Sequence, residues 1–181
     1  MGFVSNVTME TVPDYRYKKT SLILFPTMYQ ACDAAALLKE SGSVNAAELM
    51  DRPSLRSAEM QGSVSGESGH PELDEIVRNF VCSIKSLDEN AAALLIEICC
   101  DTEQELEARS AAVAKTLNDS PNKTVQDIVF TSDPLVSKYY WDIRKGLIPL
   151  VGGNRKRGST YLMEDVATDV SRLASMGIDI K

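Results

Sequence analysis

The sequence predicts an α+β fold of the ferredoxin-like, split βαβ type, in which a mostly antiparallel sheet carries helices on one face. Two observations support this prediction. Short apolar runs alternate with helical patterns along the chain, in the order β-α-β-α-β-α-β-α. No glycine-rich loop joins a strand to a helix, so the phosphate cradle of a parallel nucleotide-binding sheet is missing. An all-parallel wound sheet uses the same element order and is the alternative.

The first strand and the first helix follow from a few positions. Residues 21–25 form an apolar run that ends at Pro26, as expected of a buried strand. Thr27 and Gln30 form a capping pair, because the hydroxyl and the amide each satisfy a free backbone N–H group at a helix start. The alanine- and leucine-rich stretch that follows predicts a helix, and Gly42 is suited to end it.

The next elements follow the same reasoning. Residues 46–50 predict a second strand, and Pro53 suits the first turn of a helix after it. The glycine- and serine-rich stretch 61–69 predicts an exposed, mobile loop. Apolar side chains at helical spacing then predict a helix over 73–84, the clearest in the sequence, and the apolar run 91–100 predicts a central third strand.

The last part of the chain continues the alternation. Asp101 and Gln104 form a cap pair for a helix, residues 124–130 predict a fourth strand, and Pro134 opens a further helix. Beyond that helix we expect a strand at residues 159–166 and a short last helix from residue 168.

Composition argues against several classes of protein. The 181 residues are 44% hydrophobic and 25% charged, as in a globular domain, and no stretch approaches the ~20 apolar residues of a membrane-spanning helix. The start of the chain has no signal-peptide pattern, so we expect a cytoplasmic protein. The four cysteines form no C-x-x-C pair, which argues against a metal or iron–sulfur site here. Adjacent Cys99 and Cys100 are expected to be core residues rather than a redox pair.

Charge is unevenly distributed along the chain. The formal net charge is −7, which argues against general nucleic-acid binding, because such binding needs a basic surface. Residues 144–163 nevertheless carry five cationic side chains and no acidic one. A cationic island in an acidic protein is a candidate anion site, and a solvated basic loop is the alternative.

Arg144 is the first candidate for substrate binding within this island. Trp141, Arg144 and Ile148 are three and four residues apart, so they share one face of the predicted helix. An arginine binds a carboxylate through two parallel hydrogen bonds, and burial against an indole ring strengthens this pairing by excluding water. A surface arginine whose stem covers the tryptophan is the alternative.

Four further residues are candidates for contact with an anion. Arg155, Lys156 and Arg157 lie in a glycine-flanked loop whose backbone a ligand can approach closely. Glu164 stands next to Asp165 in the predicted strand. Neighbouring strand residues point to opposite faces, so a proton-sharing pair of carboxylates is not expected there. We assign no catalytic residue and no metal ligand.

The chain resembles FAD-linked oxidases of the vanillyl-alcohol-oxidase type in three stretches: GFVSNVTMETVPDYRYKKTSLILFP, YYWDIRKGLIPLVGG and RKRGSTYLMEDVATDVSRLA. That family includes D-lactate, glycolate and D-2-hydroxyglutarate dehydrogenases. The resemblance implies that residues 1–16 are the end of a FAD-binding domain with its linker. Residues 17–181 would then be part of the substrate-binding, or cap, domain. The closest pattern is that of large members with iron–sulfur segments.

The resemblance therefore implies a substrate-binding fragment of a FAD-dependent oxidoreductase that oxidises a 2-hydroxy acid. FAD and any iron–sulfur cluster would bind mainly outside the chain, so the fragment alone is expected to be inactive. The arginine that holds the substrate carboxylate in family members falls on Arg144, and the other candidate residues would lie near the flavin. Ile148 and Met163 stand where hydroxyglutarate dehydrogenases carry a threonine and a lysine. The identity of the hydroxy acid is thus left open.

The expected partners are a small 2-hydroxy acid and the upstream FAD-binding domain of the same chain. An open sheet edge would also allow two copies of the fragment to pair as a homodimer. The alternative function is a non-enzymatic ferredoxin-like module whose basic loop, residues 155–157, binds an anionic ligand or an acidic partner.

Overall fold

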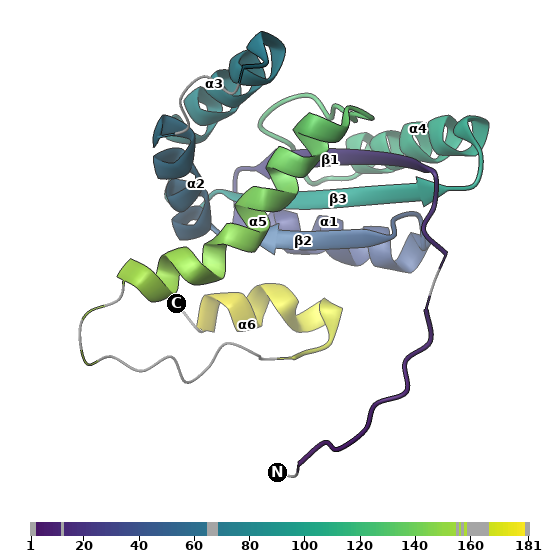
Figure 1. The fold of residues 1–181 in the computed structure, drawn as a ribbon, viewed down its shortest axis with the longest axis horizontal. Coiled ribbons are helices and arrows are strands. Elements are labelled where there is room, and N and C mark those ends of the chain that lie inside the picture. Colours follow the sequence, from purple (N-terminus) through teal and green to yellow (C-terminus); the bar gives the residue numbers. More distant parts are fainter. Residues whose placement is uncertain are drawn as a thin grey trace.

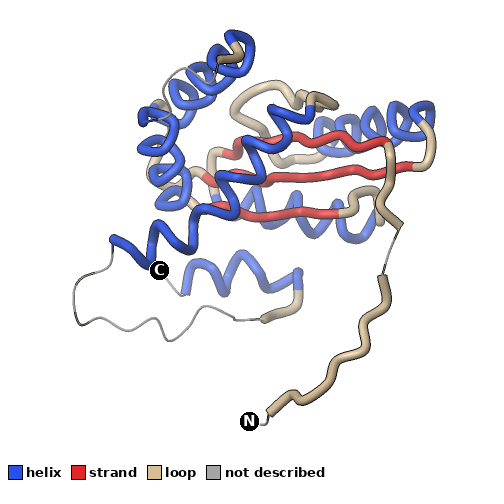
Figure 2. Tube along the Cα trace, viewed as in Figure 1, coloured by secondary structure: helices blue, strands red, loops and turns tan. Residues whose placement is uncertain are grey.

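A computed structural model describes residues 3–11, 13–64, 69–154, 156, 158 and 167–179. In this part of the chain a three-stranded sheet lies between two layers of helices (Figures 1 and 2). The strands are β1 (Tyr17–Phe25), β2 (Ala46–Met50) and β3 (Ala92–Cys100). The helices are α1 (Met28–Ser41), α2 (Arg52–Val64), α3 (Pro71–Lys85), α4 (Glu103–Asp119), α5 (Pro134–Asn154), the short 3-10 helix η1 (Val170–Arg172) and α6 (Leu173–Asp179).

The sheet has the strand order β1-β3-β2, and both pairs are antiparallel. β3 is central because its residues are apolar on both faces: every residue of the strand except Glu97 is buried. In the register, Leu95 lies between Leu22 of β1 and Glu48 of β2, and Glu97 lies between Thr20 of β1 and Ala46 of β2. The predicted α+β class and the antiparallel sheet are thus confirmed.

Helices cover both faces of the sheet, which corrects the prediction of helices on one face. α1 and α4 pack on one face, behind the sheet in Figure 1, while α2, α3 and α5 pack on the other. The reason lies in β3, where Leu94 and Ile96 point to the α1/α4 side and Ala93 and Leu95 to the opposite side. Two apolar faces each require a cover of helices.

The helix ends follow the predicted chemistry at several positions. The Gln30 backbone N–H donates to the Thr27 hydroxyl at 3.2 Å, and α1 ends at Gly42 with a φ of 59°. Two predicted boundaries were wrong. α4 is capped by Thr102, which accepts a hydrogen bond from the Glu105 N–H at 3.2 Å, rather than by Asp101. α2 extends to Val64, into the stretch predicted to be a loop.

The predicted fourth strand at residues 124–130 is wrong. This segment follows the outer edge of β1 but makes only local backbone contacts with it. Thr20 and Thr131 exchange two hydrogen bonds of 2.9 Å, and the Val125 N–H donates to the Leu24 carbonyl at 2.8 Å. Val129 is 71% exposed, so one side of the apolar run gains no burial from a regular ladder. The predicted strand at 159–166 lies outside the described residues.

The last helices and the cysteines agree with the predictions. η1 and α6 form the expected short helical end of the described chain. Cys99 and Cys100 are buried at the end of β3 as free thiols. None of the described helices combines the length and the apolar character needed to cross a lipid bilayer.

Candidate functional site

The site is organised by α5, which crosses the sheet on the face opposite α1 and α4 (Figure 1). Along this helix Ser137 contacts β1, Trp141 contacts β3 and Arg144 contacts β2. The three residues lie four and three positions apart, so they share the sheet-facing side of the helix. The predicted proximity of Trp141 and Arg144 on one face is consistent with this arrangement.

Trp141 is held by a carboxylate on the central strand. Its Nε1–H donates to Glu97 Oε2 at 3.1 Å. The other carboxylate oxygen of Glu97 accepts a weak hydrogen bond from the Cys99 thiol, whose sulfur lies 3.7 Å away. Burial, and then the charge of Glu97, raises the pKa of Cys99 to about 11, so this thiol stays neutral. Glu97 therefore acts as an acceptor that fixes the indole ring.

Arg144 is held by a second carboxylate, on the edge strand β2. Its Nε donates to Glu48 Oε2 at 2.8 Å, and the two side chains are 32% and 37% exposed. This bond uses the Nε end of the guanidinium, while the four other N–H donors of an arginine lie on its terminal nitrogens. The arginine is thus oriented by the sheet and remains accessible from solvent.

The sequence itself contains a signal for these two carboxylates. Glu48 is the only charged residue of β2, and Glu97 is the only charged residue of β3. A charge inside an apolar strand is costly unless a partner satisfies it. A lone carboxylate in such a strand indicates a cationic or donor partner, although not which one.

A cavity of about 370 Å³ lies beside the first half of α5. Trp141 is one of its lining residues, and Arg144 is not. Its walls come from the start of β1, from the turn before α5 and from α5 itself. The lining residues are Arg16, Lys18, Ser132, Pro134, Ser137, Lys138, Trp141 and Lys145. Four of these are cations, and only Lys145 belongs to the cationic island of the sequence analysis.

The remaining predicted site residues are not brought into this arrangement. Lys156 is exposed and follows the end of α5. Arg155, Arg157 and Glu164 lie outside the described residues. In the part of the chain that the structure describes, no group of three histidine, cysteine or carboxylate side chains is arranged to hold a metal ion.

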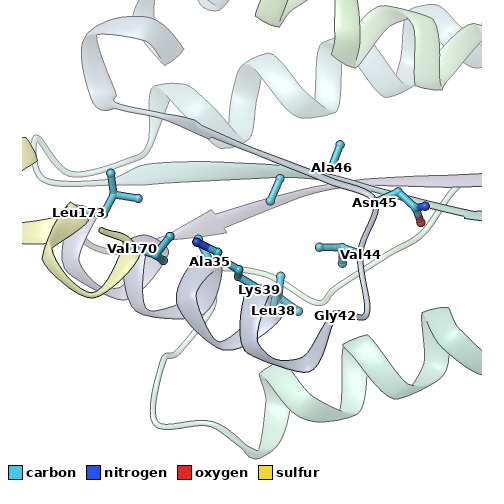
Figure 3. Close-up of a pocket in the computed structure, with 10 residues that line it drawn as sticks. Ala35, Leu38, Lys39, Gly42, Val44, Asn45, Ala46, Val170 and Leu173 are labelled. Atoms are coloured by element: carbon cyan, nitrogen blue, oxygen red, sulfur yellow. The ribbon is translucent and has the colours of Figure 1, made fainter. Parts of the chain in front are cut away.

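A different kind of cavity lies between α1, β2 and the C-terminal helices (Figure 3). Its volume is about 320 Å³, and its walls include Leu38, Val44, Val170 and Leu173, with Lys39 and Asn45 as polar lining residues. A ligand site generally needs a few convergent polar groups in an apolar cavity. None of the predicted site residues lines this cavity, so it is not the candidate site.

Two solved structures of alkyldihydroxyacetonephosphate synthase, in space groups P1 and P212121, are each similar to 75% of this chain, with 14% sequence identity and a TM-score of 0.49. The matched region is 24% of each of those chains, so this chain spans only part of their length. No curated protein matches the sequence.

The family itself is shown by the sequence model that matches the chain. The model described as "FAD linked oxidases, C-terminal domain" covers residues 15–181, which is nearly the whole sequence. This confirms the resemblance seen in the sequence at the level of that domain family. The chain therefore belongs to the C-terminal domain family of the FAD-linked oxidases.

Proposed function

We propose that this chain is the substrate-binding domain of a FAD-dependent oxidoreductase that oxidises a 2-hydroxy acid. The family match supports the link to a flavin. In this proposal residues 17–181 form the substrate-binding domain, residues 1–16 join it to a FAD-binding domain, and Arg144 holds the substrate carboxylate. The observation that carries the role of Arg144 is its ion pair with Glu48, which orients the guanidinium and leaves it accessible.

The ion pair with Glu48 is compatible with binding a second carboxylate. Glu48 engages Nε at 2.8 Å, so the fork formed by the terminal nitrogens can receive a substrate carboxylate through two parallel bonds. A guanidinium that is already positioned loses less rotamer freedom when the substrate binds. Glu48 is thus a positioning residue, and Arg144 is the binding residue.

Trp141 lies about one helical turn before Arg144 and supports the same site. Because its N–H is bonded to Glu97, the indole ring has a fixed orientation on the sheet-facing side of α5. Trp141 and Arg144 share the sheet-facing side of α5, and an apolar ring on that side lowers the local dielectric constant and so strengthens the attraction of the guanidinium to a carboxylate. We also propose that Lys156 lies near the anion or the flavin. The same proposal covers Arg155, Arg157 and Glu164, which lie outside the described residues.

FAD, when bound, supplies the acceptor for the hydride that leaves the substrate α-carbon. The described residues suit an acid group better than a whole dinucleotide. The cavity beside α5 has a volume of about 370 Å³ and is lined by cations. A glycine-rich strand–helix turn, which would bind a diphosphate, is not seen in the sequence. We therefore propose that most of the FAD site lies in another domain. Iron–sulfur segments and the cytoplasmic location stay predictions.

The test is Arg144→Lys in the FAD-loaded protein that carries this domain. Lysine keeps the charge but not the fork, so we expect kcat/KM for the preferred acid to fall about 100-fold, as for two lost charge-assisted bonds. The substrates are D-lactate, glycolate and D-2-hydroxyglutarate. Arg144→Ala should regain part of its activity when guanidinium is added.

The control is Lys115→Gln, because Lys115 is an exposed cation on α4, on the other side of the sheet. It should leave kcat/KM unchanged. An Arg144→Lys enzyme with the kcat/KM of the unaltered protein would contradict the proposed role of Arg144. Flavin that no 2-hydroxy acid of the panel reduces would contradict the proposed substrate class.

A further inference from the structure

We infer that the cavity beside the first half of α5 is a binding site for a small oxyanion, a carboxylate or a phosphate group, next to Trp141. This site goes beyond the proposed function, because Arg144 does not line the cavity. It rests on the charge of the cavity wall, on the fixed aromatic side chain and on the two serines at its edge.

Charge is the first reason. The chain carries a net charge of −7, yet Arg16, Lys18, Lys138 and Lys145 line one cavity whose described lining includes no acidic residue. Like charges that gather in one cavity repel one another, and an anion between them removes this repulsion. Such a concentration of cations in an acidic chain favours an anionic ligand.

The ion pairs of the cavity leave part of this charge unbalanced. Lys18 pairs with Asp14 at 2.5 Å, and Lys138 pairs with Asp142 within the exposed surface of α5. Neither Arg16 nor Lys145 forms an ion pair with any residue that the structure describes. The hydrogen bond that the Lys18 ammonium donates to Asp14 also raises the pKa of Lys18, which keeps this amine charged.

The positions of the cations follow from the fold. Lys138, Trp141 and Lys145 are three and four residues apart, so they line one side of α5. The Arg16 guanidinium lies 5.5 Å from the centre of the Tyr17 ring, which holds it at the start of β1. The start of β1 and α5, which are remote in sequence, thus place positive charge around one cavity.

The neutral lining residues complete the site. Ser132 and Ser137 bring hydroxyl groups, and the Ser137 Oγ lies 2.5 Å from the Thr20 Oγ. Hydroxyls and ammonium groups together can donate several hydrogen bonds to one oxyanion. The Trp141 ring adds an apolar surface for the body of an organic acid. A cavity of about 370 Å³ is within the size range of small-ligand sites.

Trp141 also provides the measurement, because it is the only tryptophan of the chain. The 181-residue chain is titrated with inorganic phosphate and, separately, with acetate, while sodium chloride keeps the ionic strength constant. We expect a saturable change in tryptophan emission. Saturation by phosphate alone, by acetate alone or by both supports the site and identifies the group that it prefers.

Matched variants locate the binding. Lys145→Gln and Arg16→Gln should each lower the affinity for the anion about tenfold, as expected for one lost charge-assisted hydrogen bond. Lys115→Gln removes the same charge on α4 and should leave the affinity unchanged. Arg144→Lys should also leave it unchanged, which separates this site from the proposed substrate site. Urea denaturation checks that each variant is folded.

Two results would overturn the inference. The first is an emission change that does not saturate with either anion at constant ionic strength. The second is a Lys115→Gln variant that loses as much affinity as Lys145→Gln, because this would indicate a response to overall charge rather than to the cavity.

Discussion

The two faces of the sheet are built from the same three strands but differ in chemistry. The face under α1 and α4 is apolar along the length of β3, from Ala92 to Cys100. The face under α5 is apolar at one end, around Leu22 and Leu95, and becomes polar toward Glu97. Every second residue of a strand points to the same side, so one strand can build both surfaces.

The two faces therefore differ in how much their helices depend on polar contacts with the strands. On the α1/α4 face, burial of apolar side chains is the main contact between the sheet and the helices, and Lys19 of β1 adds an ion pair of 2.6 Å with Glu107 of α4. The α5 face carries two carboxylates, Glu48 and Glu97. Arg144 of α5 donates a hydrogen bond to Glu48, and Trp141 donates one to Glu97. The polar part of a sheet face is therefore where the candidate site is found.

The largest expected effect belongs to the apolar face. Leu94→Ala removes a fully buried side chain under α1 and α4, and we expect the free energy of unfolding to fall by about 3 kcal/mol, since a cavity remains. Leu95→Ala should cost a similar amount on the other face. Leu135→Ala is the control, because Leu135 is 42% exposed. Urea denaturation measures all three, and a loss below about 1 kcal/mol for Leu94→Ala would contradict the description of this core.

Removing a polar contact from the α5 face should lower the free energy of unfolding by a smaller amount. Glu97→Ala leaves the Trp141 N–H without its acceptor. We expect the free energy of unfolding to fall by about 1–3 kcal/mol and the tryptophan emission to shift. Glu97→Gln retains an amide oxygen as acceptor, so its effect should be smaller. Equal stabilities for Glu97→Ala and Glu97→Gln would show that this hydrogen bond does not hold the indole ring.

The thiol next to Glu97 makes the α5 face sensitive to alkaline pH. The pKa of Cys99 is raised from 9.0 to about 11 in the folded chain, so between these values the unfolded chain has released more protons. Stability should therefore fall as the pH rises through this window, and part of that fall should disappear in Cys99→Ala. Cys32, also raised to about 11, contributes in the same direction.

Alkylation provides a separate measurement of the same thiol. At pH 8, iodoacetamide should modify the exposed Cys82 before the buried, neutral Cys99, as followed by peptide mass spectrometry. Adding urea should remove the difference. Equal rates at the two cysteines in the folded chain would be inconsistent with a protected Cys99.

The smallest effect on stability is expected at the pair that the proposed function uses. Glu48→Gln weakens an ion pair whose side chains are about one-third exposed, so we expect a loss below about 1 kcal/mol that shrinks further at high salt. Glu59→Gln should cost more, because its partner Arg52 is only 5% exposed. If Glu48→Gln proved the more costly of the two, the pair would serve stability rather than ligand binding.

Sequence reasoning was most successful where the signal is local. The capping pair Thr27–Gln30 and the helical spacing of Phe80, Val81 and Ile84 were read directly, and the structure shows both. The strand predicted at 124–130 was wrong because an apolar run does not reveal whether both of its sides will be covered. The selection of Arg144 and Trp141 remains a prediction, although their partners are now known.

The sequence by itself determined where most helices and strands lie, and the family, because periodicity, caps and motif residues are properties of neighbouring positions. Only the tertiary structure decided that helices cover both faces of the sheet. It also paired Arg144 with Glu48, 96 residues away, and Trp141 with Glu97, 44 residues away. These pairs depend on strand register and on the path of α5 across the sheet. Both are set by the burial of the whole core, which no local pattern specifies.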